Sequence, residues 1–124
     1  MPNNKNYIHF YNHPDNNRVT VEVVKLSYIL NNFHSIQSFL GGDIQTRENC
    51  LDYLGHIFKA KKDPNYFYDS FGNCCTITII HRGVTIENEY TKEIAKDIKL
   101  DDIKIILEKW LEFITTREPI EYSW

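Results

Sequence analysis

The sequence is short of the residues and motifs that mark most small catalytic and metal-binding domains. Its 124 residues include only three cysteines and five glycines, and they contain no Cys-x-x-Cys pair and no Gly-x-Ser-x-Gly turn. These absences exclude the best-known zinc-binding and nucleophile motifs. His9 and His13 stand four residues apart, but they fall on a predicted strand and turn, where that spacing does not stack two side chains. We therefore expect no metal site and no cofactor.

An excess of basic charge and a long apolar run are also missing. The net charge is −3 and the isoelectric point is about 5.9, whereas proteins that bind nucleic acid usually present a basic surface. No apolar run approaches the roughly 20 residues that span a bilayer. Met1–Asn6 is polar and no apolar segment follows it, so we predict no signal peptide. These observations predict a cytoplasmic protein that binds neither nucleic acid nor membranes directly.

The odd number of cysteines argues against a disulfide framework. Cys74 and Cys75 are adjacent, so on a strand they would point to opposite faces and could not easily bond to each other. We predict reduced, mostly buried thiols. The alternative is a small enzyme or ligand-binding module, in which Cys74 or Cys75 works with a histidine that is distant in the sequence. Such a site would need a cleft and a thiol with a perturbed pKa.

Composition and length predict one globular domain over residues 1–124, because 42% of the residues are hydrophobic and 25% are charged. Alternation of apolar and polar residues predicts β-strands, and short polar segments predict the turns that pair them into two hairpins. The predicted strands are 7–11 and 18–25, joined by a turn at 13–17, and 75–80 and 84–90, joined by a turn at 81–83. We expect residues 65–73 to be a tyrosine-rich connection with a turn at 71–73, and residues 120–124 to be an extended aromatic tail.

Apolar residues recur with helical spacing in three segments. The first begins near residue 27 and ends at Leu40, with Gly41-Gly42 as its C-cap, and the others span 44–61 and 101–116. Hairpins separated by helices predict an α+β fold, in which an antiparallel sheet has about three helices packed on it. The expected buried face of the second helix is Cys50, Leu51, Leu54, Ile57 and Phe58. That of the third is Ile103, Ile106, Leu107, Trp110, Leu111 and Ile114.

Two pairs of acidic residues stand at spacings that bring like charges together, one pair on a strand and one on a helix. They are Glu87 with Glu89, and Glu108 with Glu112. Each such contact costs about a few tenths of a kcal/mol. A cationic partner would offset that cost. The alternative is an ordinary solvated surface, whose charge Lys104 and Lys109 compensate.

Asp52 and His56 stand four residues apart on the second predicted helix, so their side chains can pair. A carboxylate that orients an imidazole is one half of a catalytic arrangement. We favour an ordinary charge pair on a solvated helix face, because no nucleophile lies nearby in the sequence.

The part of the chain from Cys75 to Tyr122 has a hairpin followed by the segment Leu100-Asp101-Asp102-Ile103, a tryptophan-bearing amphipathic helix and the segment Arg117-Glu118-Pro119-Ile120. With the chain's size, acidity and many asparagines, this part resembles the small immunity proteins encoded beside bacterial contact-dependent growth-inhibition toxins. The resemblance covers about the last 40% of the chain and assigns no functional residue. It implies a cytoplasmic inhibitor without enzymatic activity, which binds one toxin domain, often a nuclease, and blocks its active site or its substrate surface.

We therefore predict an immunity protein, or antitoxin, whose partner is a cognate toxin domain. The four glutamates above would be electrostatic anchors, because nucleases are commonly basic around the active site. Large exposed aromatic side chains are the usual hot spots of such interfaces. The predicted ones are Tyr90, Tyr122 and Trp124. A third possibility is a structural module that oligomerises through the tail at residues 118–124.

Overall fold

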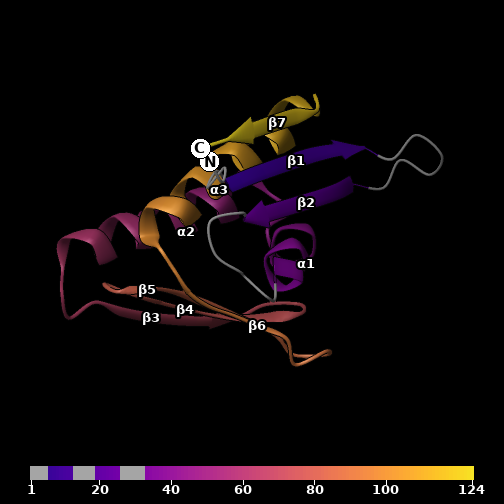
Figure 1. The fold of residues 1–124 in the computed structure, drawn as a ribbon. Helices are drawn as coiled ribbons and strands as arrows, with labels where there is room; N and C mark the ends of the chain where they lie inside the picture. The colour runs from indigo at the N-terminus through magenta and orange to yellow at the C-terminus, as the bar shows by residue number, and fades with distance from the viewer. Residues whose placement is uncertain (1–5, 13–18, 26–32) are drawn as a thin grey trace, which may run out of the picture.

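The computed structural model describes residues 6–12, 19–25 and 33–124 (Figure 1). The predicted turn at 13–17 and the first part of the first predicted helix lie outside these residues. Three helices and seven strands follow one another along the described chain. They are β1 (Asn6–Asn12), β2 (Val19–Lys25), α1 (Phe33–Asp43), α2 (Arg47–Lys62), β3 (Phe67–Phe71), β4 (Cys75–Ile80), β5 (Gly83–Asn88), β6 (Ile94–Ile98), α3 (Leu100–Thr116) and β7 (Ile120–Ser123).

The strands form two antiparallel sheets, one in the order β2-β1-β7 and the other in the order β3-β4-β5-β6. Both predicted hairpins are confirmed, as the pairs β1–β2 and β4–β5. Gly83 opens β5 directly after the two-residue turn, at a point where β6 passes very close. A Cβ on Gly83 would lie 2.8 Å from the carbonyl oxygen of Ile98, so a larger residue would force the two strands apart.

The helices lie between the two sheets. In Figure 1 the helices are above β3–β6, and none of the described helices lies below that sheet. Helix α1 contacts β2 on one side and β4, β5 and β6 on the other, while α2 and α3 pack against each other. The predicted α+β class is therefore confirmed, with the helices on one face of the four-stranded sheet. None of the described helices is long and apolar enough to cross a membrane.

Helix α3 buries most of the face that its sequence predicts. Ile103, Ile106, Leu107 and Trp110 are buried, while Phe113 replaces the predicted Leu111 and Ile114, which are only partly buried. The indole Nε1 of Trp110 donates to the carbonyl oxygen of Ile44 at 2.8 Å, and its ring meets that of Phe10 edge-on at 5.2 Å. This tryptophan joins α3 to both the α1–α2 connection and β1.

Helix α2 presents a different face to the core from the one predicted. The predicted positions Leu51 and Phe58 are wrong, because these side chains are 48% and 58% exposed. The buried side is rotated toward Tyr53, whose ring packs edge-on against Phe39 of α1 at 5.1 Å. The residues that α2 buries are Cys50, Tyr53, Ile57 and Ala60.

The predicted C-cap at Gly41-Gly42 is also wrong, since α1 continues through both glycines to Asp43. Neither has a positive φ, so neither adopts the left-handed conformation of a glycine cap. Gly42 instead makes room for a neighbour, because a Cβ there would lie 3.0 Å from Sγ of Cys74. Its carbonyl oxygen accepts from Nδ2 of Asn73 at 3.1 Å, which caps this end of the helix.

Two strands, β3 and β6, were not predicted. β3 occupies part of the expected tyrosine-rich connection. β6 lies between the second predicted hairpin and the third predicted helix. In β6 the pairing with β5 is interrupted between Val84 and Ile86, and Asp97 has a φ of 56°. This irregularity hides the alternation that marks a strand. The extended tail is confirmed as β7, which pairs with β1.

Candidate functional site

The face of the four-stranded sheet that points away from the helices is not covered by any of the described helices (Figure 1). Residues that are direct partners in an antiparallel sheet share a face. The register gives one row of Phe71, Thr76, Glu87 and Ile94, a second of Asp69, Thr78 and Thr85, and a third of Phe67 and Ile80. We call these nine residues the open face. The opposite face holds the buried residues of β4 and β5, such as Ile77, Ile79, Val84 and Ile86.

Two phenylalanines stand out on the open face. Phe67 and Phe71 are 65% and 69% exposed, although both belong to a regular strand. Asp69 lies between them on the same face of β3, and Glu87 lies in the row of Phe71. Among the described residues, neither Asp69 nor Glu87 has an ion-pair partner. Apolar surface rimmed by acidic groups is typical of an interaction site.

The predicted anchors Glu89 and Tyr90 follow directly after β5. Glu89 accepts a hydrogen bond from Oγ1 of Thr76 at 2.6 Å and another from Nζ of Lys92 at 3.1 Å. These bonds, chiefly that from Thr76, hold the pKa of Glu89 below its usual value, so the side chain is ionised at neutral pH. Because Thr76 belongs to the open face, Glu89 adds its carboxylate there. Tyr90 is 79% exposed at this end of the sheet.

The predicted anchors Glu108 and Glu112 belong to α3, in the helical layer. Glu108 pairs with Nζ of Lys104 at 3.2 Å, and Glu112 pairs with Nζ of Lys109 at 3.9 Å. Their charges are thus compensated within the helix, as the alternative interpretation of the sequence expects. The structure does not bring these acids together with Glu87 on the open face.

Tyr122 and Trp124 lie on and just after β7, next to α3. Nζ of Lys109 sits 4.3 Å from the centre of the Tyr122 ring, a cation–π contact. The indole Nε1 of Trp124 donates to Oδ1 of Asp102 at 2.9 Å. Tyr122 is 38% exposed and Trp124 is partly buried, and both rings make contacts within the chain. The predicted site residues therefore fall into two groups, one at the open face and one on α3 and β7.

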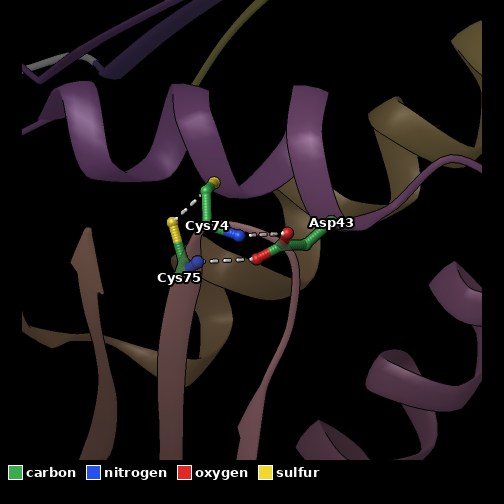
Figure 2. Close-up of side chains that lie close together, drawn as sticks. All are labelled: Asp43, Cys74 and Cys75. Carbon is green, nitrogen blue, oxygen red and sulfur yellow. Dashed lines mark hydrogen bonds between the residues drawn. The ribbon is translucent and has the colours of Figure 1, made fainter. Parts of the chain in front are cut away.

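The adjacent cysteines form a cluster with the last residue of α1. Figure 2 shows Oδ1 and Oδ2 of Asp43 facing the backbone nitrogens of Cys74 and Cys75, each at 3.0 Å. The two sulfur atoms lie 3.3 Å apart and both cysteines are free. The expectation that the two side chains point to opposite faces applies to a strand that contains both cysteines. Cys74 precedes β4, so that condition is not met.

The Asp43 carboxylate and the two thiols place three donor atoms within 4.8 Å of one another, which is the spacing that a metal ion requires. Burial raises the pKa of Cys74 and, far more strongly, that of Cys75, so both thiols hold their protons at neutral pH. An ion would have to displace these protons. The cluster contains no histidine, so it does not provide the cysteine–histidine pair of the enzyme alternative. Its chemistry fits a clamp that joins the end of α1 to the start of β4.

The structure adds a hydroxyl group to the predicted pair Asp52–His56. Nε2 of His56 lies 3.5 Å from Oδ2 of Asp52, and Nδ1 lies 2.5 Å from the hydroxyl of Tyr66. The imidazole stacks on Tyr68 of β3, with ring centres 3.6 Å apart. Desolvation and the neighbouring Tyr68 and Asp52 raise the pKa of Tyr66, which disfavours a nucleophilic tyrosinate. This cluster fastens β3 to α2.

A groove of about 550 Å³ runs between α2 and α3. Leu54, Ile57 and Phe58 contribute its apolar lining, and lysines stand around it. Most of this charge is already compensated, since Lys61 pairs with Asp101 and Lys104 with Glu108. The groove therefore offers apolar contact but little charge to select a ligand.

Comparisons with protein-family models, with curated proteins and with solved structures found no match to this chain.

Proposed function

We propose that this chain is an immunity protein that neutralises a toxin domain, a nuclease, by docking the open face over the toxin's active site or substrate surface. The observation that carries the proposal is the pair Phe67 and Phe71, both about two-thirds exposed on a sheet face that no described helix covers. The resemblance of the C-terminal part to immunity proteins supports the same function.

The chemistry of the open face suits an apolar contact surrounded by complementary charge. Burying a phenylalanine completely contributes about 1.5–3 kcal/mol, so covering two that are two-thirds exposed would contribute roughly 2–4 kcal/mol in all. Binding energy of this kind is typically concentrated in a few aromatic side chains at the centre of an interface.

The charge of the open face favours a basic partner. Asp69, Glu87 and Glu89 place three carboxylates on or beside the open face, and of these Glu89 pairs with Lys92. A nuclease binds a polyanion and needs basic residues where its substrate lies. An acidic face can occupy that surface, and its charge accelerates association with a basic partner.

The test is to produce the chain together with the protein encoded by the adjacent reading frame. We expect the chain to restore the growth of cells that produce this protein, and the two purified proteins to form a nanomolar complex in titration calorimetry. Absence of both the complex and the growth rescue would disprove the proposal.

Variants then locate the surface. We expect Phe67→Ala with Phe71→Ala to weaken the complex at least about tenfold, which corresponds to 1.4 kcal/mol. Phe58→Ala is the matched control, because Phe58 is 58% exposed but lies on α2. Equal losses for the control and the double variant would show that the partner does not use the open face.

Charge-reversal variants show which of the two predicted groups of acidic residues contacts the partner. Glu87→Lys should slow association, because it reverses a carboxylate that has no ion-pair partner among the described residues. Glu108→Lys changes a residue that α3 already compensates. A larger loss of association rate for Glu108→Lys would place the interface on α3.

A further inference from the structure

The two edges of the four-stranded sheet differ in how well they are protected from a further strand. Edge strands that must stay unpaired commonly carry bulges and charged residues. β6 has both, since its register with β5 shifts between Val84 and Ile86 and the exposed residue Asp97 has a φ of 56°. β3 has no bulge, and only one of its exposed residues is charged. It pairs with β4 over five consecutive residues without a bulge, and its exposed side chains are Phe67, Asp69 and Phe71.

β3 is also anchored on the side that faces the helices. Tyr68 stacks on His56 of α2, and Tyr66 just before the strand hydrogen-bonds the same imidazole. A strand that is already fixed in the extended conformation loses little conformational freedom when another strand pairs with it. Of the described strands, only β4 pairs with β3, so the other edge of β3 carries the backbone groups that a further strand would use.

We propose that β3 is a docking edge for an extended segment of a partner protein, which adds a fifth strand to the sheet and carries a basic residue between two apolar ones, in the pattern apolar-x-basic-x-apolar. This inference rests on the proposed function and names the form of contact at the same surface. The apolar positions of the segment would pack beside Phe67 and Phe71, and the basic position would lie beside Asp69. Side chains directly opposite each other across two strands are close enough to interact in this way.

The alternative occupant of this edge is a second copy of the chain. Pairing two copies of β3, whether centred and antiparallel or parallel and in register, places Asp69 opposite Asp69. Like charges directly opposite each other destabilise a strand pair. The charge of β3 therefore selects a partner segment with a basic residue over self-association.

The probe for this contact is the seven-residue peptide Thr-Val-Thr-Lys-Thr-Val-Thr, titrated into the full ¹⁵N-labelled chain. We expect amide signals of β3 to shift, and the counterpart peptide with glutamate in place of lysine to bind about fivefold more weakly or worse. In the variant Asp69→Lys this preference should reverse. A peptide preference that Asp69→Lys does not change would overturn the proposal, as would shifts confined to residues outside β3.

Two further measurements separate this inference from the proposed function. In the complex with the protein from the adjacent reading frame, hydrogen exchange should slow at amides of β3. If that complex forms and depends on Phe67 and Phe71, but exchange in β3 does not slow, strand addition is wrong while the proposed function stands. Sedimentation checks the alternative, because a wild-type dimer that Phe67→Ala dissociates would show that the occupant is a second copy.

Discussion

At the scale of single residues, Asp43 is a side chain whose substitution should clearly lower the free energy of unfolding. Its two carboxylate oxygens accept the backbone N–H groups of Cys74 and Cys75, 31 and 32 residues further along the chain. An asparagine can accept only one of these bonds, and its amide group then faces the other N–H. We expect Asp43→Asn to lower the free energy of unfolding by about 1–3 kcal/mol, measured by urea denaturation.

Asp69→Asn is the control for this experiment, because Asp69 is exposed and has no ion-pair partner among the described residues. It should change the stability by less than about 0.5 kcal/mol. Similar stabilities for Asp43→Asn and Asp69→Asn would show that Asp43 does not act as a clamp.

Cys50 should make the stability depend on pH in the alkaline range. The thiol is completely buried and burial raises its pKa from 9.0 to about 11. Its contribution is fully present below pH 9, where the thiol is protonated in both states. It is lost as the pH rises from 9 to 11, because the unfolded chain then releases the proton first. The loss at pH 11 is on the order of 2–3 kcal/mol.

Other groups titrate in the same range, so the informative quantity is the difference between the wild type and Cys50→Ala. Urea denaturation at pH 8 and at pH 10.5 should show that the stability advantage of the wild type shrinks by about 1–2 kcal/mol at the higher pH. An advantage that is equal at both pH values would mean that the buried thiol does not resist ionisation.

At the scale of elements, the two glycines at the end of α1 should respond differently to the same substitution. Both lie within the helix without a positive φ, where alanine is normally about 0.5–1 kcal/mol better than glycine. A Cβ on Gly41 would meet nothing within 4 Å, whereas a Cβ on Gly42 would lie 3.0 Å from Sγ of Cys74. We expect Gly41→Ala to raise the melting temperature and Gly42→Ala to leave it unchanged or lower it. A stabilising Gly42→Ala would mean that α1 and Cys74 are not in close contact.

The elements that the sequence predicted well are those in which the apolar residues face the core. The alternation in β4 and the helical spacing of Ile103, Ile106 and Trp110 directly reflect burial on one side. In β3 the phenylalanines point to solvent and the inward positions are Tyr68 and Ser70, so the pattern does not indicate a strand. Leu51 and Phe58 likewise fit the helical spacing of α2 but lie outside its contacts.

At the scale of the whole molecule, the exposed phenylalanines of β3 show why the sequence predicted only part of the candidate site. The acids Glu87 and Glu89 were found from their spacing on a predicted strand, but Phe67 and Phe71 look like core residues in any count of apolar positions. Only the order of strands in the sheet, with every described helix on the other side, shows that these rings have nothing to cover them. An exposed site of this kind depends on contacts between distant segments, which local patterns do not contain.

The C-terminal strand, β7, is one edge of the three-stranded sheet, and we expect it to contribute to stability. β7 pairs with β1, and the backbones of Asn6 and Trp124 exchange two hydrogen bonds of 2.8 and 3.1 Å. Deleting residues 120–124 would remove these bonds, the contact between Trp124 and Asp102, and the cover over one edge of β1. We expect the deletion to lower the free energy of unfolding by about 3 kcal/mol or more, measured by urea denaturation.

This expectation differs from that of a tail that serves only oligomerisation, because β7 already pairs with β1 along one edge and Trp124 already donates to Asp102 within this chain. Trp124→Phe is the matched control, since it keeps an aromatic ring, although a smaller one, and removes the indole N–H that donates to Asp102. Its cost should be smaller, about 1–2 kcal/mol. If the deletion instead left the stability of the monomer unchanged and dissociated an oligomer in sedimentation, the tail would belong to an interface between copies, and the pairing of β7 with β1 would be the wrong account of this strand.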